Sequence, residues 1–72
     1  MNIQEITISN NQRKQLLRNE QLESVLFEDD NGDLIVNAAA YQELKSQLNP
    51  PPLEAILGDE ALDFNAEFFV FS

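Results

Sequence analysis

The sequence predicts a small α+β fold, namely a β-hairpin with two short helices, a triproline break and an apolar C-terminal strand or helix. Three observations predict it. Asn31-Gly32 lies between two runs of β-prone residues, which is the strongest short hairpin signal. Helix-forming segments with N-cap residues flank that hairpin on both sides. Alternating apolar residues then follow the prolines at positions 50–52.

The chain is expected to begin with a short strand and a weak helix. Isoleucines and a threonine within residues 3–8 favour an extended segment. Ser9 and Gln12 form the capping-box pattern S-x-x-Q, so a helix is predicted over residues 10–22. Because this helix has few apolar residues, it must gain its stability from packing.

The predicted hairpin joins two strands around the Asn-Gly dipeptide. These strands cover residues 24–28 and 34–36. If Asn31-Gly32 forms a two-residue type I′ loop, Phe27 faces Val36. The same register brings Asp30 opposite Asp33, and like charges directly opposite are unfavourable. Either the register differs by one residue, or the repulsion is tolerated at an exposed tip.

A second helix is predicted to follow, and the prolines then divide the chain. Asn37 is a good N-cap for a helix from Ala38 to about Leu48. The triproline at 50–52 ends that helix, because proline cannot continue it. We therefore expect an α+β core over residues 1–49 and an acidic, aromatic partner-binding segment over residues 50–72.

The last segment fits either a strand or a helix. Apolar residues alternate with polar ones from Leu62 onward, which is typical of a strand. A helical stripe beginning at Leu53 is the alternative. The β-prone Phe-Phe-Val-Phe ending favours the strand. In a strand, Phe69 and Phe71 would lie on the face opposite Phe68, so both faces would be apolar.

This tail is the main candidate for a partner-binding surface. It lies in a stretch, residues 46–72, that contains acids but neither Lys nor Arg. Aromatic anchors among acids combine burial with electrostatic steering. The candidate residues are Asp59, Glu60, Asp63, Phe64, Glu67, Phe68, Phe69 and Phe71. The alternative is that the tail simply completes the core. The acidic hairpin tip is a second candidate, formed by Asp29, Asp30 and Asp33.

Composition indicates the kind of partner. The chain has 72 residues, with 13 acidic and 4 basic side chains, giving a net charge of −9. Such a polyanion is repelled by nucleic acid, so we expect a basic protein partner and no tight binding to nucleic acid. The alternative is that the charge serves only solubility. Because so small a chain has no disulfide to stabilise it, we also expect a homodimer.

Catalysis and metal binding are not expected. The chain has no His, the usual general base near neutral pH, and no Cys. The aspartates of the hairpin tip do not fit a calcium loop, since Leu34 and Ala40 occupy positions that require Gly and Glu. We therefore expect a protein that is not an enzyme, with no cofactor and no metal. Without a signal peptide or a long apolar run, it is expected to be cytoplasmic and not membrane-bound.

The basic residues gather in the first predicted helix. Arg13, Lys14 and Arg18 lie roughly on one side of it. This arrangement fits a solvated helix face. It also fits a small phosphate-contacting patch, whose binding would be weak and sensitive to salt.

One stretch resembles a known family. From Leu26 to Leu48, the strand, Asn31-Gly32 turn, strand and helix order resembles the prevent-host-death (Phd/YefM) antitoxins, with the closest similarity in LIVNAAAYQEL at 34–44. The resemblance implies an N-terminal α+β part that dimerises and binds operator DNA, and a C-terminal segment that wraps a toxin. The turn of that family is typically basic, whereas this turn is acidic.

The expected function is therefore binding. The sequence favours a non-catalytic protein that neutralises or inhibits a protein partner, as an antitoxin does. One alternative is a phage or mobile-element inhibitor that mimics the charge of nucleic acid. Another is a structural or assembly subunit whose C-terminal strand joins a neighbour's sheet.

Overall fold

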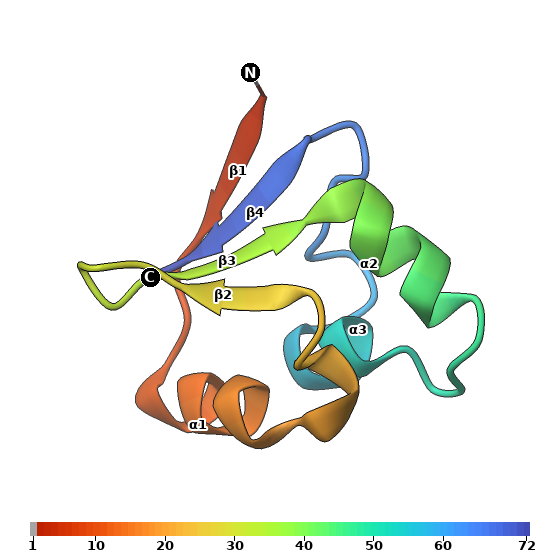
Figure 1. The fold of residues 1–72 in the computed structure, drawn as a ribbon, viewed down its shortest axis with the longest axis horizontal. Coiled ribbons are helices and arrows are strands. Elements are labelled where there is room, and N and C mark those ends of the chain that lie inside the picture. The colour runs from red at the N-terminus through yellow and green to blue at the C-terminus, as the bar shows by residue number, and fades with distance from the viewer. Residues whose placement is uncertain (1) are drawn as a thin grey trace.

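A mixed four-stranded sheet, with helices packed on one of its faces, forms the protein (Figure 1). The computed structural model describes residues 2–72. The elements are β1 (Ile3–Ile6), α1 (Asn10–Arg18), a 3₁₀ turn (Glu20–Leu22), β2 (Leu26–Glu28), β3 (Leu34–Asn37), α2 (Ala38–Lys45), α3 (Pro52–Leu57) and β4 (Phe68–Phe71). The predicted α+β class is confirmed.

The helix starts follow the predicted caps. The N–H of Gln12 donates to Ser9 Oγ at 3.1 Å, and the Gln12 side chain accepts from the Ser9 N–H, so the capping box is formed. Asn37 caps α2 by accepting from the Ala40 N–H at 2.9 Å. The first predicted helix is shorter than expected. Its backbone becomes extended at Asn19, whose side chain instead starts the 3₁₀ turn.

The predicted hairpin is present, and its register differs by one residue from that of a two-residue type I′ loop, which was the first of the two alternatives. Phe27 faces Ile35, whereas the prediction paired it with Val36. The Gly32 N–H donates to the Asp29 carbonyl at 3.0 Å, and of the described residues only the glycines have positive φ. The loop is therefore a type I turn followed by Gly32 at φ +84°, a three-residue connection.

The C-terminal strand lies inside the sheet. The strand order is β1-β4-β3-β2, with β4 parallel to β1 and antiparallel to β3. The tail thus ends in a strand, although this strand is shorter than the alternation from Leu62 suggested, and α3 precedes it. The division into residues 1–49 and 50–72 does not separate two structural units, because strands from both segments form one sheet.

The core lies between the helices and the inner face of the sheet. Its largest fully buried side chains are Tyr41, Phe69, Phe71, Leu16, Leu22, Leu34, Leu53 and Val36. Phe69 and Phe71 are 0% exposed, so their predicted role as partner-binding residues is wrong. As the alternation predicted, Phe68 lies on the opposite face of the sheet from Phe69 and Phe71. The helices cover the face of Phe69 and Phe71 and leave the face of Phe68 uncovered.

Candidate functional site

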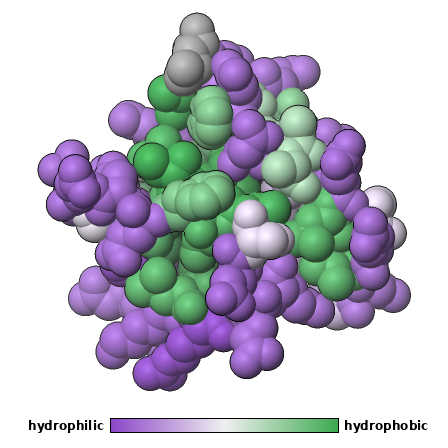
Figure 2. Space-filling view, viewed as in Figure 1, coloured by the Kyte–Doolittle hydropathy of each residue, from purple (hydrophilic) through white to green (hydrophobic). Residues whose placement is uncertain are grey.

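The uncovered face of the sheet carries a group of apolar side chains. Strand alternation and register place them in two adjacent rows across the strands, one from Phe27 through Ile35 to Val70 and one from Phe68 to Ile3. We call this group the outer patch, formed by Ile3, Phe27, Ile35, Phe68 and Val70. Figure 2 shows hydrophobic side chains gathered over the strands.

The outer patch is accessible to solvent. Phe27 is 62% exposed and Ile3 is 46% exposed, while Ile35, Phe68 and Val70 are half-buried. An open hollow of about 260 Å³ lies between Ile3, Ile35, Phe68 and Val70. A contiguous exposed apolar surface of this kind marks an interaction site more often than scattered exposed residues do.

Carboxylates lie along the β1 edge of the sheet. On the outer face, Glu5 of β1 lies opposite Val70, and Glu67 is exposed just before β4. Asp59, Glu60 and Asp63 are exposed in the loop after α3. Gln4 of β1 holds that loop, since its side chain donates to the Ala61 carbonyl at 2.9 Å and accepts from the Asp63 N–H at 2.8 Å. The predicted acidic residues of the tail are therefore gathered beside β1.

Phe64 has a different environment from the other predicted aromatic residues. It is half-buried and stacks on Tyr41, with ring centroids 6.3 Å apart. Lys45 Nζ lies 4.1 Å from the centroid of the Phe64 ring, a cation–π contact. Phe64 thus supports the core and is not part of the outer patch.

Tyr41 belongs to a buried polar network. Its hydroxyl donates to Glu54 Oε1 at 2.7 Å and accepts from the Leu53 N–H at 3.0 Å. Lys45 Nζ binds Glu54 Oε2 at 3.0 Å. Burial raises the pKa of the Tyr41 hydroxyl, and the hydrogen bond to Glu54 raises it further. The carboxylate is thus held by two donors, and this network joins α2 to α3.

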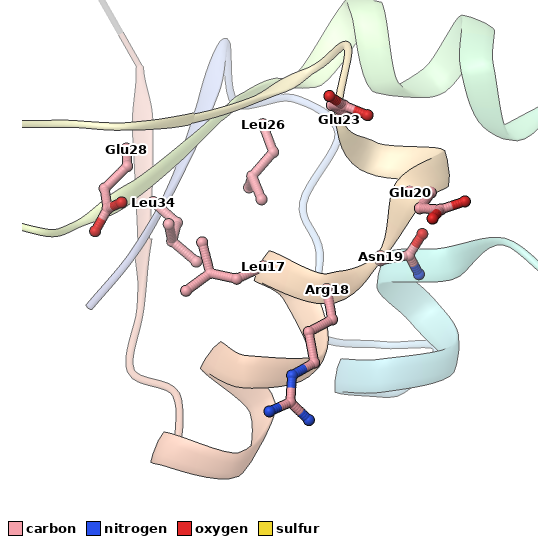
Figure 3. A pocket seen from close by; sticks show the side chains of 8 residues that line it. All are labelled: Leu17, Arg18, Asn19, Glu20, Glu23, Leu26, Glu28 and Leu34. Atoms are coloured by element: carbon pink, nitrogen blue, oxygen red, sulfur yellow. The ribbon is translucent and has the colours of Figure 1, made fainter.

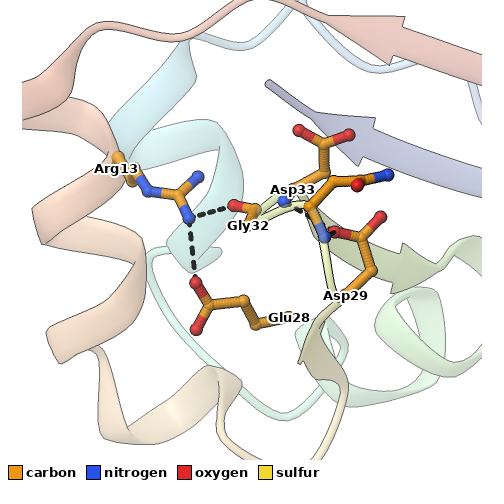
Figure 4. A network of polar contacts seen from close by, with 6 residues as sticks. Arg13, Glu28, Asp29, Gly32 and Asp33 are labelled. Atoms are coloured by element: carbon orange, nitrogen blue, oxygen red, sulfur yellow. Dashed lines mark hydrogen bonds and ion pairs between the residues drawn. The ribbon is translucent and has the colours of Figure 1, made fainter.

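The acidic hairpin tip is tied to α1 (Figure 4). Arg13 donates to the Gly32 carbonyl and to Glu28 Oε2, the latter at 3.1 Å. One Asp29 oxygen accepts from the Asn31 and Asp33 N–H groups at 3.0 and 2.8 Å. Asp29 therefore has a local role in the turn, and Arg13 is engaged, so it does not form a free basic patch with Lys14 and Arg18.

A second concavity lies between α1 and β2. It has a volume of about 380 Å³ and is lined by Leu17, Arg18, Asn19, Glu20, Glu23, Leu26, Glu28 and Leu34. Figure 3 shows Arg18 and the glutamates around leucines from both elements. Charges of both signs surround this groove, so it has a weaker electrostatic preference than the β1 side of the sheet.

Sequence reasoning missed most of the outer patch. Phe27, Ile35 and Val70 were expected in strands, but Ile3, on β1, lies far from them in the sequence. Only the pairing of β1 with β4 brings Ile3 beside Phe68. The available signal was the alternation within each strand, which separates Phe68 and Val70 from Phe69 and Phe71.

Residues 2–72 contain no group of three or more His, Cys, Asp or Glu side chains arranged to hold a metal ion. None of the helices in the described chain is long and apolar enough to cross a membrane. Comparison with protein-family models, curated proteins and solved structures finds no match to this chain. The resemblance to the Phd/YefM antitoxins therefore stays a hypothesis.

Proposed function

We propose that this protein is a non-catalytic binding protein that neutralises or inhibits a basic protein partner, as an antitoxin does. The observation that carries the proposal is the outer patch, an exposed apolar face with no helix over it. Its partner is expected to present an apolar surface at the centre of the contact and Lys or Arg side chains around it.

Charge favours a different protein over a second copy of this chain. Each copy carries a net charge of −9, and two copies facing each other through the outer patch would add this like-charge repulsion, with Glu5 at the border of the patch on each copy. A partner with basic side chains would instead be attracted and steered into place. The homodimer expected from the sequence is thus the less favoured occupant of this surface.

The outer patch also bears on the alternative functions. A mimic of nucleic acid would need dispersed carboxylates more than exposed aromatic residues. The apolar outer patch therefore favours a partner held by hydrophobic contacts over a partner held by charge alone. A structural subunit could not extend a neighbour's sheet through its C-terminal strand, because β4 already has a strand on each side.

Affinity capture from cells of the source organism, followed by an activity assay, tests the proposal. The immobilised wild type is expected to retain a basic protein that elutes with salt, and its measured activity should fall when the acidic protein is added. Phe27→Ser and Phe68→Ser should each weaken binding about tenfold or more, since burying an aromatic side chain contributes about 1.5–3 kcal/mol.

Leu17→Ser is the matched control. Leu17 is 49% exposed, similar to Ile3, but lies on α1 beside the groove. This variant should retain the partner. If Leu17→Ser loses the partner while both phenylalanine variants keep it, the groove is the binding site and the outer patch is not. Sedimentation should show a monomer; a dimer broken by Phe27→Ser would make a second copy the occupant.

A further inference from the structure

We infer that the free edge of β1 accepts a β-strand from the partner, one that carries both apolar and Lys or Arg side chains. This inference rests on the proposed function and adds how the partner is held. It joins the outer patch and the acids beside β1 into a single site.

Hydrogen bonding shows which backbone groups of this edge are free. Asn2 and Ile6 carbonyls accept from β4-side N–H groups, at 2.7 Å from Glu67 and 3.0 Å from Ser72. In a parallel ladder alternate residues bond to the same neighbour, so Ile3 and Glu5 direct their N–H and C=O groups to the opposite side. Nothing within residues 2–72 pairs with that side, and Figure 1 shows β1 at the edge of the sheet.

The β1 edge has little of the usual protection against strand pairing. Exposed edges are commonly blocked by charged side chains, especially lysine, by proline or a bulge, or by being very short. β1 spans four residues, Ile3–Ile6, and contains neither lysine nor proline, and its one charged residue is Glu5. β2, the other edge, has only three residues, and Arg13 holds its last residue, Glu28. The longer and more open edge is therefore β1.

The side chains at this edge define the incoming strand. On the outer face, Ile3 extends the outer patch, and Glu5 lies beside its register partner Val70. An added strand would therefore place an apolar residue near Ile3 and a basic one near Glu5. On the inner side, the loop that Gln4 holds presents Asp63 and its neighbouring acids. No basic residue of this chain lies on β1, because its four basic residues are on α1 and α2, namely Arg13, Lys14, Arg18 and Lys45.

Proline substitution at an outward-facing position tests strand pairing. Glu5→Pro removes one edge N–H donor but leaves the β1–β4 hydrogen bonds in place, a position where strands tolerate proline. Glu5→Ala removes the same charge but keeps the donor. Binding of the captured basic protein is measured for both variants, and circular dichroism checks that both are folded.

Glu5→Ala should weaken binding a few-fold, and Glu5→Pro should weaken it about tenfold further, the effect of losing one intermolecular hydrogen bond. The pair Glu28→Ala and Glu28→Pro on the β2 edge is the control, and its two members should bind equally. If the Glu5 pair binds equally while Phe68→Ser still weakens binding, strand addition is wrong and the proposed function stands. If no protein is captured, both proposals fail.

Hydrogen exchange on the wild type gives a second measurement that needs no variant. On binding the captured protein, the amides of Ile3 and Glu5 should exchange more slowly, because they gain hydrogen-bond acceptors. Unchanged exchange at both amides in the saturated complex overturns the inference, even if Glu5→Pro does not fold. A partner without Lys or Arg in the strand that it contributes also overturns it.

Discussion

At the scale of single residues, Tyr41 joins α2 to α3 through its hydroxyl and to the segment after α3 through its ring. Its hydroxyl joins the Leu53 N–H and the Glu54 carboxylate, while its ring stacks with Phe64. A buried carboxylate such as Glu54 is costly unless it is paired and hydrogen-bonded. The network therefore fixes α3 against α2 at the point where the prolines interrupt the chain.

Tyr41→Phe should destabilise the protein. The ring still fills its space, but Glu54 Oε1 and the Leu53 N–H lose their partner, which costs about 1–3 kcal/mol. Urea denaturation should show a lower midpoint with the same slope. Gln42→Ala, at an exposed position of the same helix, is the control and should leave the midpoint nearly unchanged. An unchanged Tyr41→Phe midpoint would mean that the network adds nothing to stability.

Tyr41 also predicts a pH dependence. Its pKa is raised in the folded protein above the ordinary value near 10, so folding favours the protonated form. The contribution to stability is complete below about pH 10 and is lost as the pH rises toward the folded pKa. Tyr41 is the only tyrosine of the chain, so phenolate absorbance reports it alone. In a pH titration, the phenolate absorbance of the folded protein should rise at a higher pH than that of the urea-unfolded protein. Coincident titration curves for the two states would contradict this.

At the scale of elements, the sequence predicted the hairpin but not its loop. Both a two-residue type I′ loop and the observed three-residue loop accept Asn followed by Gly. They differ in whether Asn31 has positive φ, and only Gly32 does so here. The binding of Arg13 to the Gly32 carbonyl, a contact from another element, accompanies the observed loop. No local pattern indicates that contact.

Substitution of Gly32 should show this conformational requirement. A Cβ at Gly32 would meet Arg13 Nη2 at 3.6 Å, an ordinary contact, so any cost comes from the φ of +84°. Gly32→Ala should lower the free energy of unfolding by about 1 kcal/mol, and Gly32→Asn by less, because Asn tolerates this region better. Thermal melts should rank the wild type first, then Asn, then Ala. Equal stability of the Ala variant would exclude strain at this turn.

At the scale of the whole molecule, the α+β class and the strand character of the tail were predictable, but the sheet order was not. Alternation divides Phe68 and Val70 from Phe69 and Phe71, yet it does not say which pair faces the helices. That depends on β1, whose residues pair with β4 from the opposite end of the chain. Without that pairing, the sequence predicts the tail as an added segment with exposed aromatic residues.

Neighbouring phenylalanines should therefore respond very differently to substitution. Phe69→Ala removes a fully buried ring and should cost about 3–5 kcal/mol, close to the whole stability of a small domain. Phe68→Ser changes the uncovered face and should remain folded. Circular dichroism melts of both variants test this. A stable Phe69→Ala together with an unfolded Phe68→Ser would reverse the assignment of the two faces.

The place of β4 in the sheet also has a consequence for the order of events during synthesis. β1 and β3 are translated long before β4, yet each needs β4 as its neighbour. Within residues 2–72, the only strand neighbour of β1 is β4, so β1 cannot join the sheet until β4 has been synthesised.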